Sequence, residues 1–391
     1  MFRVRCLPVK AVERAIAALC LLGGASGAIE PTHPPPHYFL VFQDDFSGPR
    51  LDEQRWMYRT DVKLDSSQRP ENVFLRDGRL VIALRKESHR GKSYTGGGVI
   101  SRPAFRYGYF EARVKMHGGA GWHQSVWAMY ADPSTTYPAR MRTEIDGIEF
   151  DSDLPTKGHM GLIRWRGPAQ SRSSTCTPGI YRGPLGFDAT ADFHNYGFEW
   201  TEREVRFFVD GDLRCVLPYP PEENEHDRIN LWLTAIAYQQ LAGKVDESRL
   251  PGEMLVEHAA VYQRDLYVDD GDPEYSETGS WEVITRGGYA DAGWRRSCEG
   301  EATATWQLPV PAPGSYEVSI YKNYQALAGG LAELEIRAAG ADHRGRLSFS
   351  DPPAGWNTIG TFRFEGKNER VHMRRLEGCV GSDMLRLLRV P

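Results

Sequence analysis

Short apolar stretches recur along this chain and are separated by turn residues. Asp77-Gly78 lies between the apolar runs Val73–Leu75 and Arg79–Leu84, which predicts a β-hairpin. Further strands are predicted over Tyr38–Phe42, Tyr107–Met116, Val126–Tyr130, Asn195–Trp200, Val205–Val209, Ile229–Ala237 and Leu255–Tyr262. No long amphipathic helix is evident. This succession of short strands and turns predicts an all-β protein built on a large two-sheet sandwich.

A shift in composition predicts a domain boundary. Val268–Gly279 is acidic and polar, and strand-like patterning resumes after it. The strands predicted there are Ala302–Leu308, Gly314–Tyr321, Ala332–Ala338, Thr358–Phe364, Arg370–Arg375 and Met384–Val390. We therefore predict a first domain over residues 29–267 and a second, smaller β-sandwich over residues 268–391.

The first 28 residues have the pattern of a secretory signal peptide. Positively charged residues precede a short apolar run, Ala15–Leu22, and Ser26-Gly27-Ala28 supplies small residues for cleavage. The apolar run is too short to cross a bilayer. We expect removal of residues 1–28, no membrane span, and a secreted protein in the extracellular or periplasmic space.

The number of cysteines is consistent with an exported protein that contains disulfides. Two of the six lie in the predicted signal peptide, which leaves Cys176, Cys215, Cys298 and Cys379. An even number of cysteines in an exported chain indicates disulfides, although four cysteines allow three pairings. Because two lie in each half of the mature chain, we predict Cys176–Cys215 and Cys298–Cys379. No CxxC or HExxH motif supports a metal site.

The net charge and the composition give no indication of a nucleic-acid partner. The net charge is -5 and the pI is near 6.2, so no basic surface for nucleic acid is indicated. Hydrophobic and charged fractions of 41% and 25% are those of a soluble globular protein. We expect a monomer without a catalytic cofactor, and a structural calcium ion stays open as an alternative.

The strand predicted over Thr143–Phe150 carries three acids. Side chains alternate between the two faces of a strand, so Glu144 and Asp146 share a face and Glu149 points the other way. A β-bulge at Gly147 would return Glu149 to the face of the other two. Like charges in a row destabilise a purely structural strand. The alternatives are a solvated acidic surface, a calcium site, and a pair of catalytic carboxyl groups.

Glycoside hydrolysis needs two carboxyl groups across the scissile bond. A separation of about 5–5.5 Å gives retention of configuration, and a wider separation gives inversion. Glu144 and Glu149 lie about four strand positions apart, ~13 Å along the backbone, and long side chains leaning together shorten this distance. Asp146, between them, is suited to hydrogen-bond one carboxyl group and to separate the pKa values of the pair.

The chain resembles the family 16 glycoside hydrolases, the laminarinase, lichenase and agarase-like group. Their bulged E-[ILV]-D-x-x-E signature corresponds to residues 144–149 here. Similar segments follow the family order at residues 42–56, 107–113, 193–211 and 254–262. The resemblance covers about residues 38–264. It implies a concanavalin A-like jelly roll with a cleft, in which Glu144 is the nucleophile, Asp146 its helper and Glu149 the general acid/base.

The family pattern also implies residues that contact the sugar. Trp127 matches the cleft tryptophan, and aromatic faces stack against sugar C–H groups. The common W-P-x-F-W sequence is replaced by His123-Gln124-Ser125-Val126-Trp127, and Trp122 is expected to compensate. His159 is expected to border the cleft. Three arginines near the site in sequence suggest either an anionic polysaccharide or a solvated surface: Arg142, Arg164 and Arg166.

The C-terminal unit resembles golvesin/xanthan-lyase-type carbohydrate-associated domains. The similar residues lie at 268–281, 302–306, 314–318 and 360–362. The implied role is glycan or cell-surface attachment, with a plain structural appendage as the alternative. The sequence thus predicts a secreted retaining endo-glycoside hydrolase that cleaves a β-linked polysaccharide, of the β-1,3-glucan or algal galactan type. A transglycosylase with the same residues and a catalytically silent lectin are the rival interpretations.

Overall fold

The computed structural model describes residues 35, 38–131, 142–166, 171–177, 182–219, 228–289, 293–322, 329–350 and 354–390. The predicted signal peptide lies outside these residues. Within them, strands dominate, and the helical elements are short: α1 (Gln239–Ala242), η1 (Pro70–Asn72) and η3 (Glu247–Arg249). In the described part of the chain, no helix has both the length and the apolar character needed to cross a bilayer. The structure is nearly all β, as the sequence predicts.

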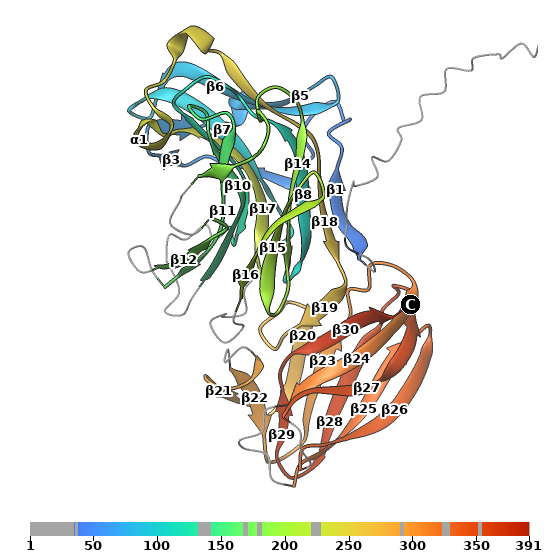
Figure 1. Ribbon diagram of the computed structural model, residues 1–391. Helices are drawn as coiled ribbons and strands as arrows, with labels where there is room; N and C mark the ends of the chain where they lie inside the picture. The colour runs from blue at the N-terminus through green and yellow to red at the C-terminus, as the bar shows by residue number, and fades with distance from the viewer. Residues whose placement is uncertain are drawn as a thin grey trace, which may run out of the picture.

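Two curved antiparallel sheets pack face to face in the upper body of Figure 1. The first sheet contains β5 (Val73–Arg76), β6 (Arg79–His89), β1 (Phe39–Asp44), β18 (Gly252–Gln263), β8 (Gly108–Lys115), β14 (His194–Trp200), β15 (Glu204–Val209) and β16 (Asp212–Pro218). The second contains β2 (Trp56–Tyr58), β7 (Lys92–Ser101), β17 (Asn230–Ala237), β9 (Trp122–Met129), β10 (Arg142–Asp151), β11 (Lys157–Trp165) and β12 (Ser171–Thr175). At its margins lie β3 (Val62–Lys63), β4 (Ser66–Gln68) and β13 (Gly183–Pro184). This jelly-roll sandwich confirms the predicted fold class.

The core between the two sheets follows from the alternation of apolar residues. Phe110 of β8 and Phe198 of β14 stack with ring centroids 4.7 Å apart. They belong to the same buried cluster as Ile145 and Ile148 of β10, which are both fully buried, as predicted. Apolar side chains from both inner faces therefore leave water together, and the opposite face of the second sheet remains available for polar chemistry.

The predicted hairpin turn is also confirmed. β5 and β6 pair in antiparallel register on either side of Asp77-Gly78, and both turn residues have positive φ values, 53° and 68°. Two consecutive residues of positive φ are typical of the tight turns that match the twist of a β-hairpin. Asp and Gly tolerate this conformation, so these two residues are enough to specify the hairpin turn.

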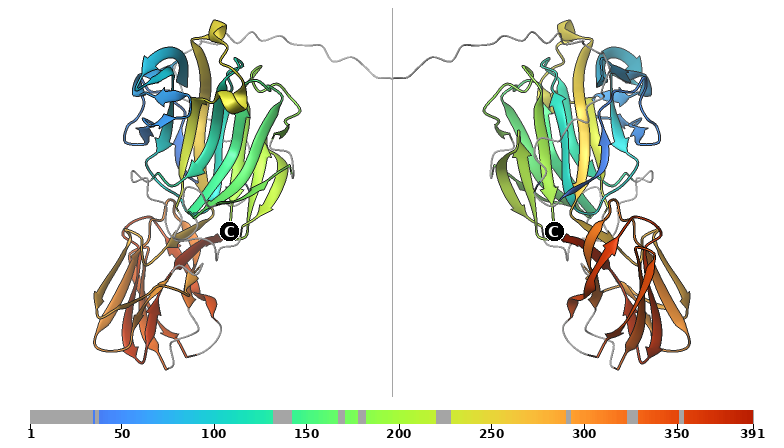
Figure 2. Two further views of the ribbon diagram at one scale, coloured as in Figure 1. Left: turned by 90° about the vertical axis from the view of Figure 1, so that its left-hand side faces the viewer. Right: turned by 90° about the vertical axis from the view of Figure 1, so that its right-hand side faces the viewer.

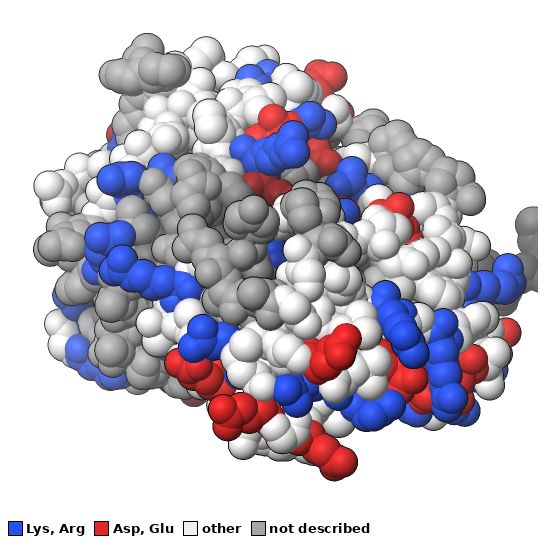
Figure 3. Space-filling view, turned by 90° about the horizontal axis from the view of Figure 1, so that it is seen from below, with Lys and Arg blue, Asp and Glu red and all other residues white. Residues whose placement is uncertain are grey.

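The second sandwich lies below the first (Figures 1 and 2). Its sheets are β19–β30–β24–β27 and β20–β23–β28–β25–β26, with a small third sheet, β21–β22–β29. Their bounds are β19 (Asp265–Val268), β20 (Tyr275–Gly279), β21 (Glu282–Ile284), β22 (Trp294–Ser297), β23 (Ala302–Gln307), β24 (Gly314–Lys322), β25 (Leu331–Ala338), β26 (Ala341–Ser348), β27 (Gly355–Phe364), β28 (Arg370–Glu377), β29 (Val380–Ser382) and β30 (Leu385–Val390). β19 precedes the predicted boundary at residue 268 and already pairs with β30. Seen from below, basic and acidic side chains lie beside one another on part of its surface (Figure 3).

Both predicted disulfides are present. Cys176 pairs with Cys215 in the first sandwich, and Cys298 pairs with Cys379 in the second. The first joins the segment after β12 to β16, and the second joins the loop before β23 to the segment after β28. Each disulfide therefore lies within one sandwich and does not link the two.

The two sandwiches meet through a buried junction. Arg106 forms an ion pair with Asp269 at 3.5 Å, and both side chains are almost completely buried. The hydroxyl groups of Tyr107 and Tyr289 lie 2.7 Å apart, and Tyr267 packs edge-on against Tyr107. Removing one member of a buried ion pair costs several kcal/mol, roughly 3–5, because the other charge stays buried without a partner. The second sandwich is therefore attached by packing and by charge as well as by the polypeptide chain.

Candidate active site

A β-bulge in β10 brings the three acids to one face of the second sheet. From Asp146 to Ile148, β10 advances two residues while its neighbour β9 advances one, from Trp127 to Val126. The extra residue is Gly147, as predicted. A Cβ atom there would lie 2.8 Å from a ring carbon of Phe198 and 2.9 Å from the carbonyl oxygen of Val126. The bulge therefore needs glycine for space.

The register on both sides of the bulge places the acids in one row. Glu144, Asp146 and Glu149 lie opposite Met129, Trp127 and Ser125 of β9, which are alternate residues of that strand. Alternate residues of a strand point to the same face. The view onto this sheet is the left-hand panel of Figure 2. In a regular strand, Glu149 would point toward the core. The extra residue at Gly147 brings it to the same face as Glu144 and Asp146.

Glu144 lies in a largely dehydrated position. Burial and the charge of Glu149 outweigh the opposing hydrogen bond from Trp165 and raise the pKa of its carboxyl group to about 7. The Nε1–H of Trp165 donates a hydrogen bond to Oε2 of Glu144. The positive charges of Lys63 and Arg59 also favour the ionised form. Glu144 therefore has one hydrogen-bond donor and two nearby positive charges that favour its carboxylate in a dry site.

Asp146 is almost completely buried, at 1% exposure, between the two glutamates. Burial raises its pKa well above the ordinary range, and the charges of Glu149 and Glu144 add to the effect. Neither carboxyl oxygen accepts a hydrogen bond from the described residues. A carboxyl group in this setting favours its protonated form, which can donate a hydrogen bond to a neighbouring carboxylate.

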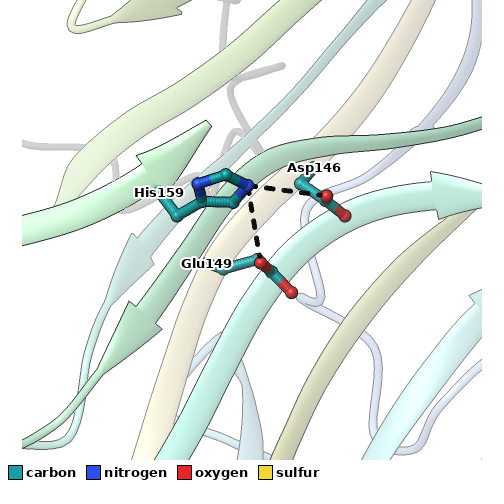
Figure 4. Close-up of side chains that lie close together, drawn as sticks. All are labelled: Asp146, Glu149 and His159. Carbon is teal, nitrogen blue, oxygen red and sulfur yellow. Dashed lines mark ion pairs between the residues drawn. The ribbon is translucent and has the colours of Figure 1, made fainter. Parts of the chain in front are cut away.

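His159 lies beside Asp146 and Glu149 on the adjacent strand β11 (Figure 4). Its Nε2 atom is 3.9 Å from Oδ2 of Asp146 and 3.9 Å from Oε2 of Glu149. One ligand atom from each of the three residues lies within 4.8 Å of the others, which is close enough to hold a cation. Because Asp146 and Glu149 lie in one row with Glu144 on the same face of β10, we interpret the group as part of an acid–base site.

A second histidine contacts Glu149 from β9. Nε2 of His123 lies 3.0 Å from Oε1 of Glu149, and Nδ1 lies 2.8 Å from Oδ1 of Asp151. Arg182 forms an ion pair with Asp151 at 2.6 Å. Burial disfavours the imidazolium, but the charge of Glu149 and the hydrogen bonds to both carboxylates outweigh it and raise the pKa of His123 to about 9.

The acids open onto a cleft of about 920 Å³. Trp127 and Trp232 lie side by side on neighbouring strands, with ring centroids 4.7 Å apart. Trp127 donates a hydrogen bond to Thr234, and Trp232 donates one to the carbonyl oxygen of Met129. Fixed aromatic faces of this kind offer rigid apolar area for a sugar ring.

The predicted site residues separate into three groups. Glu144, Glu149, His123 and Trp127 line the cleft. Asp146 and His159 lie next to these residues, with Nε2 of His159 3.9 Å from both Asp146 and Glu149, and neither lines the cleft. Trp122 is not placed to contact substrate as expected: its side chain is fully buried, because it follows the core-facing parity of β9 and packs edge-on against Tyr94.

Other cleft residues were missed by the sequence analysis. They are Tyr58, Arg59, Asp61, Lys63, Trp165, Trp232 and Tyr238, among others. They come from strands and loops far apart in the sequence, and no local spacing relates them to Glu144. The three arginines singled out for their proximity in sequence, Arg142, Arg164 and Arg166, are not among the residues that line the cleft.

Comparison with known families agrees with this geometry. Residues 60–232 match the model of the glycosyl hydrolases family 16. A β-glucanase of Rhodothermus marinus is 28% identical over 256 residues, which are 58% of this chain and 86% of that protein. A β-glucanase of Acetivibrio thermocellus is 33% identical, over 37% of this chain and 39% of its own length. The kappa-carrageenase of Pseudoalteromonas carrageenovora is 28% identical, over 41% and 47%.

Solved structures show the same fold. A non-specific family 16 endo-β-1,3(4)-glucanase, crystallised with 1,3-β-D-cellotriosyl-glucose, is 28% identical with a TM-score of 0.50. The alignment covers 60% of this chain and 98% of that one. Porphyranase B of Zobellia galactanivorans, at 20% identity and a TM-score of 0.50, shares the fold. In both alignments about the same fraction of the chain is matched, as expected for the first sandwich alone.

Proposed function

We propose, from the premise that this chain carries a family 16 glycosyl hydrolase domain and is a glycoside hydrolase, that it is a secreted retaining endo-β-1,3(4)-glucanase. The observation that carries the proposal is the bulge at Gly147, which places Glu144 and Glu149 on one face of the cleft beside Trp127. Family 16 hydrolases retain configuration, and the β-glucanases among the similar proteins support a glucan as substrate.

The proposed reaction assigns one role to each acid. Glu149 donates a proton to the glycosidic oxygen while the carboxylate of Glu144 attacks the anomeric carbon, so that the C–O bond breaks and a glycosyl-enzyme forms. Glu149 then removes a proton from water, which attacks the same carbon and releases Glu144. Trp165 holds the attacking carboxylate by its hydrogen bond. Asp146 lies buried beside both glutamates, and because its pKa is raised, its neutral form adds no third negative charge to the pair.

The arginine at the cleft, Arg59, is matched by a carboxylate, which favours a neutral glucan over a sulfated galactan. Arg59 lies over the ring of Trp232, at 5.9 Å from its centroid. Its guanidinium is bound to Asp61 through two hydrogen bonds, of 2.8 and 3.1 Å. An arginine already matched with a carboxylate in this way has little charge to offer a sulfate group. The aromatic platform is therefore best suited to an uncharged sugar face.

A panel of polysaccharides with product sizing tests the proposal. We expect laminarin and lichenan to be shortened to oligosaccharides, with agarose and kappa-carrageenan left intact. Cleavage of kappa-carrageenan alone would contradict the glucan assignment. Products longer than the starting oligosaccharide would instead identify a transglycosylase with the same residues, and inversion of the anomeric configuration would contradict retention.

The second sandwich is proposed as an accessory unit for glycan or cell-surface attachment, on the strength of its resemblance to golvesin/xanthan-lyase-type domains. The same panel tests this role when an inactive Glu144→Gln chain is used for pull-down on insoluble glycans. Binding that survives saturation of the cleft with a soluble oligosaccharide indicates a second glycan site. Complete loss of binding under these conditions indicates a structural appendage.

A further inference from the structure

A chain of three charged or titratable side chains leads to one oxygen of Glu149. Arg182 pairs with Oδ2 of Asp151, Oδ1 of Asp151 contacts Nδ1 of His123, and Nε2 of His123 contacts Oε1 of Glu149. The distances are 2.6, 2.8 and 3.0 Å in that order. The side chain of Asp151 is 1% exposed and that of His123 10%, so these contacts are largely shielded from bulk water.

The strand register explains how these residues meet. His123 of β9 lies directly opposite Asp151 of β10, and Ser125 lies opposite Glu149. Because of the bulge, Glu149 and Asp151 point to the same face of β10, and the imidazole lies between their carboxyl groups. His123 is also where this chain departs from the W-P-x-F-W sequence common in its family.

We propose that His123, held by Asp151 and Arg182, is a positioning residue that fixes Glu149 and stabilises the carboxylate formed when Glu149 gives its proton to the leaving sugar. The inference rests on the proposed function, since it requires Glu149 to be the general acid. His123 keeps its own proton throughout: the proton that moves goes from Glu149 to the glycosidic oxygen. A charge-assisted hydrogen bond is stronger to the ionised product state than to the neutral acid, so it assists proton donation.

The surroundings of His123 support a cationic ring. Two carboxylates, Glu149 and Asp151, face its two nitrogens, and each contact is satisfied when the ring donates from both. Arg182 acts on it through Asp151, while the ring of Tyr238 lies edge-on at 6.0 Å. His159 approaches the other oxygen of Glu149, at 3.9 Å. Against the opposing effect of burial, the negative charge of Glu149 and the hydrogen bonds to both carboxylates raise the pKa of His123 to about 9, so the ring is protonated when Glu149 is ionised, which is the state formed once the leaving sugar has taken the proton.

The test compares His123→Ala and His123→Gln with the parent chain. Gln retains a neutral donor toward Glu149 and removes the charge, whereas Ala removes both. His194→Ala is the matched control, since Nδ1 of His194 contacts Asp210 at 2.7 Å in the opposite sheet, outside the cleft. Each chain is assayed on polysaccharide and on a dinitrophenyl β-glycoside of laminaribiose, whose leaving group needs no proton.

We expect His123→Ala to lower kcat on polysaccharide by about tenfold or more, with KM changed less than about twofold, and to leave kcat/KM on the dinitrophenyl glycoside nearly unchanged. His123→Gln should recover part of the lost rate. In both variants the alkaline limb of the pH profile should move to higher pH by about one pH unit, because loss of a nearby positive charge favours the protonated acid. His194→Ala should match the parent.

Two results would overturn the inference. An alkaline limb that stays in place or moves to lower pH would show that His123 carries no charge that acts on Glu149. Equal losses on the two substrates would show a structural role. Failure of the premise has its own signature: a Glu149→Ala chain with full activity on polysaccharide would remove Glu149 as the acid whatever the His123 variants do.

Discussion

Two strands of this protein carry acids at alternate positions, yet their surroundings differ completely. In β25 of the second sandwich, Glu333 pairs with Arg374 at 2.7 Å, and Glu335 pairs with Arg344 at 3.3 Å. In β10 of the first, no arginine or lysine lies opposite the acids. Their cross-strand neighbours are Met129, Trp127 and Ser125 on one side and Ile163, Gly161 and His159 on the other.

The difference has an electrostatic consequence. The hydrogen bond from Arg374 lowers the pKa of Glu333, which is the ordinary result for a surface ion pair. Burial raises the pKa of Glu144 to about 7 instead. The fold therefore pairs one row of acids with arginines, and it buries the other row, where the ionised form of the carboxyl groups is disfavoured. Cross-strand arginines accompany the acidic row of the second sandwich, and burial without such partners accompanies the row at the cleft; these neighbours are set by sheet topology.

The largest contrast between the two strands is expected from removal of one carboxylate. Glu144→Gln should lower kcat by roughly a thousandfold or more, because the nucleophile is lost while the fold and glycan binding remain. The matched change Glu333→Gln should leave kcat and the melting temperature nearly unchanged, because an exposed ion pair contributes little to stability. Steady-state kinetics and thermal unfolding of both variants measure the contrast, and comparable activities in the two would refute it.

Asp146→Asn should have the next largest effect, and its effects on activity and stability should have opposite signs. We expect kcat to fall by about ten- to a hundredfold, since an amide cannot share a proton with its neighbours. The folded-state pKa of Asp146 is raised above 3.8, so its favourable contribution to stability is fully present below that pH and is lost as the pH rises. The amide does not ionise.

Below pH 4, the Asn variant should therefore have a melting temperature close to that of the parent. As the pH rises toward neutral, its melting temperature should exceed that of the parent by a growing margin. Thermal unfolding across this range provides the measurement. A melting temperature that falls below that of the parent as the pH rises would mean that the folded state favours an ionised Asp146.

Trp165→Phe should have the smallest effect and sharpens the comparison most. It removes the indole donor to Glu144 and keeps an aromatic ring. Since this hydrogen bond lowers the pKa of Glu144, the acidic limb of kcat/KM should move to higher pH, by roughly one pH unit or ~1.4 kcal/mol. Trp281→Phe, which removes a donor to the carbonyl oxygen of Thr278 in the second sandwich, should leave the profile unchanged. An unmoved limb in the Trp165 variant would contradict the role of the indole.

Much of the fold could be predicted because strands and turns are local. Alternating apolar residues specified the main strands, and Asp77-Gly78 specified a hairpin. The bulge was predictable as well, since Ile148 could remain in the core and Glu149 join Glu144 only if one residue was absorbed at Gly147. Short strands with weak alternation, such as β12 and β16, gave no comparable signal.

The sequence by itself determined the chemistry available on β10: three acids, two core isoleucines and a glycine at the bulge. Those features lie within one strand, where side-chain direction follows from periodicity alone. Only the tertiary structure decided which groups surround the acids. Register placed His123 between Glu149 and Asp151, brought Trp165 to Glu144, and took Trp122 into the core. Such contacts join residues that are distant in the chain, and they depend on which strands become neighbours and in what register.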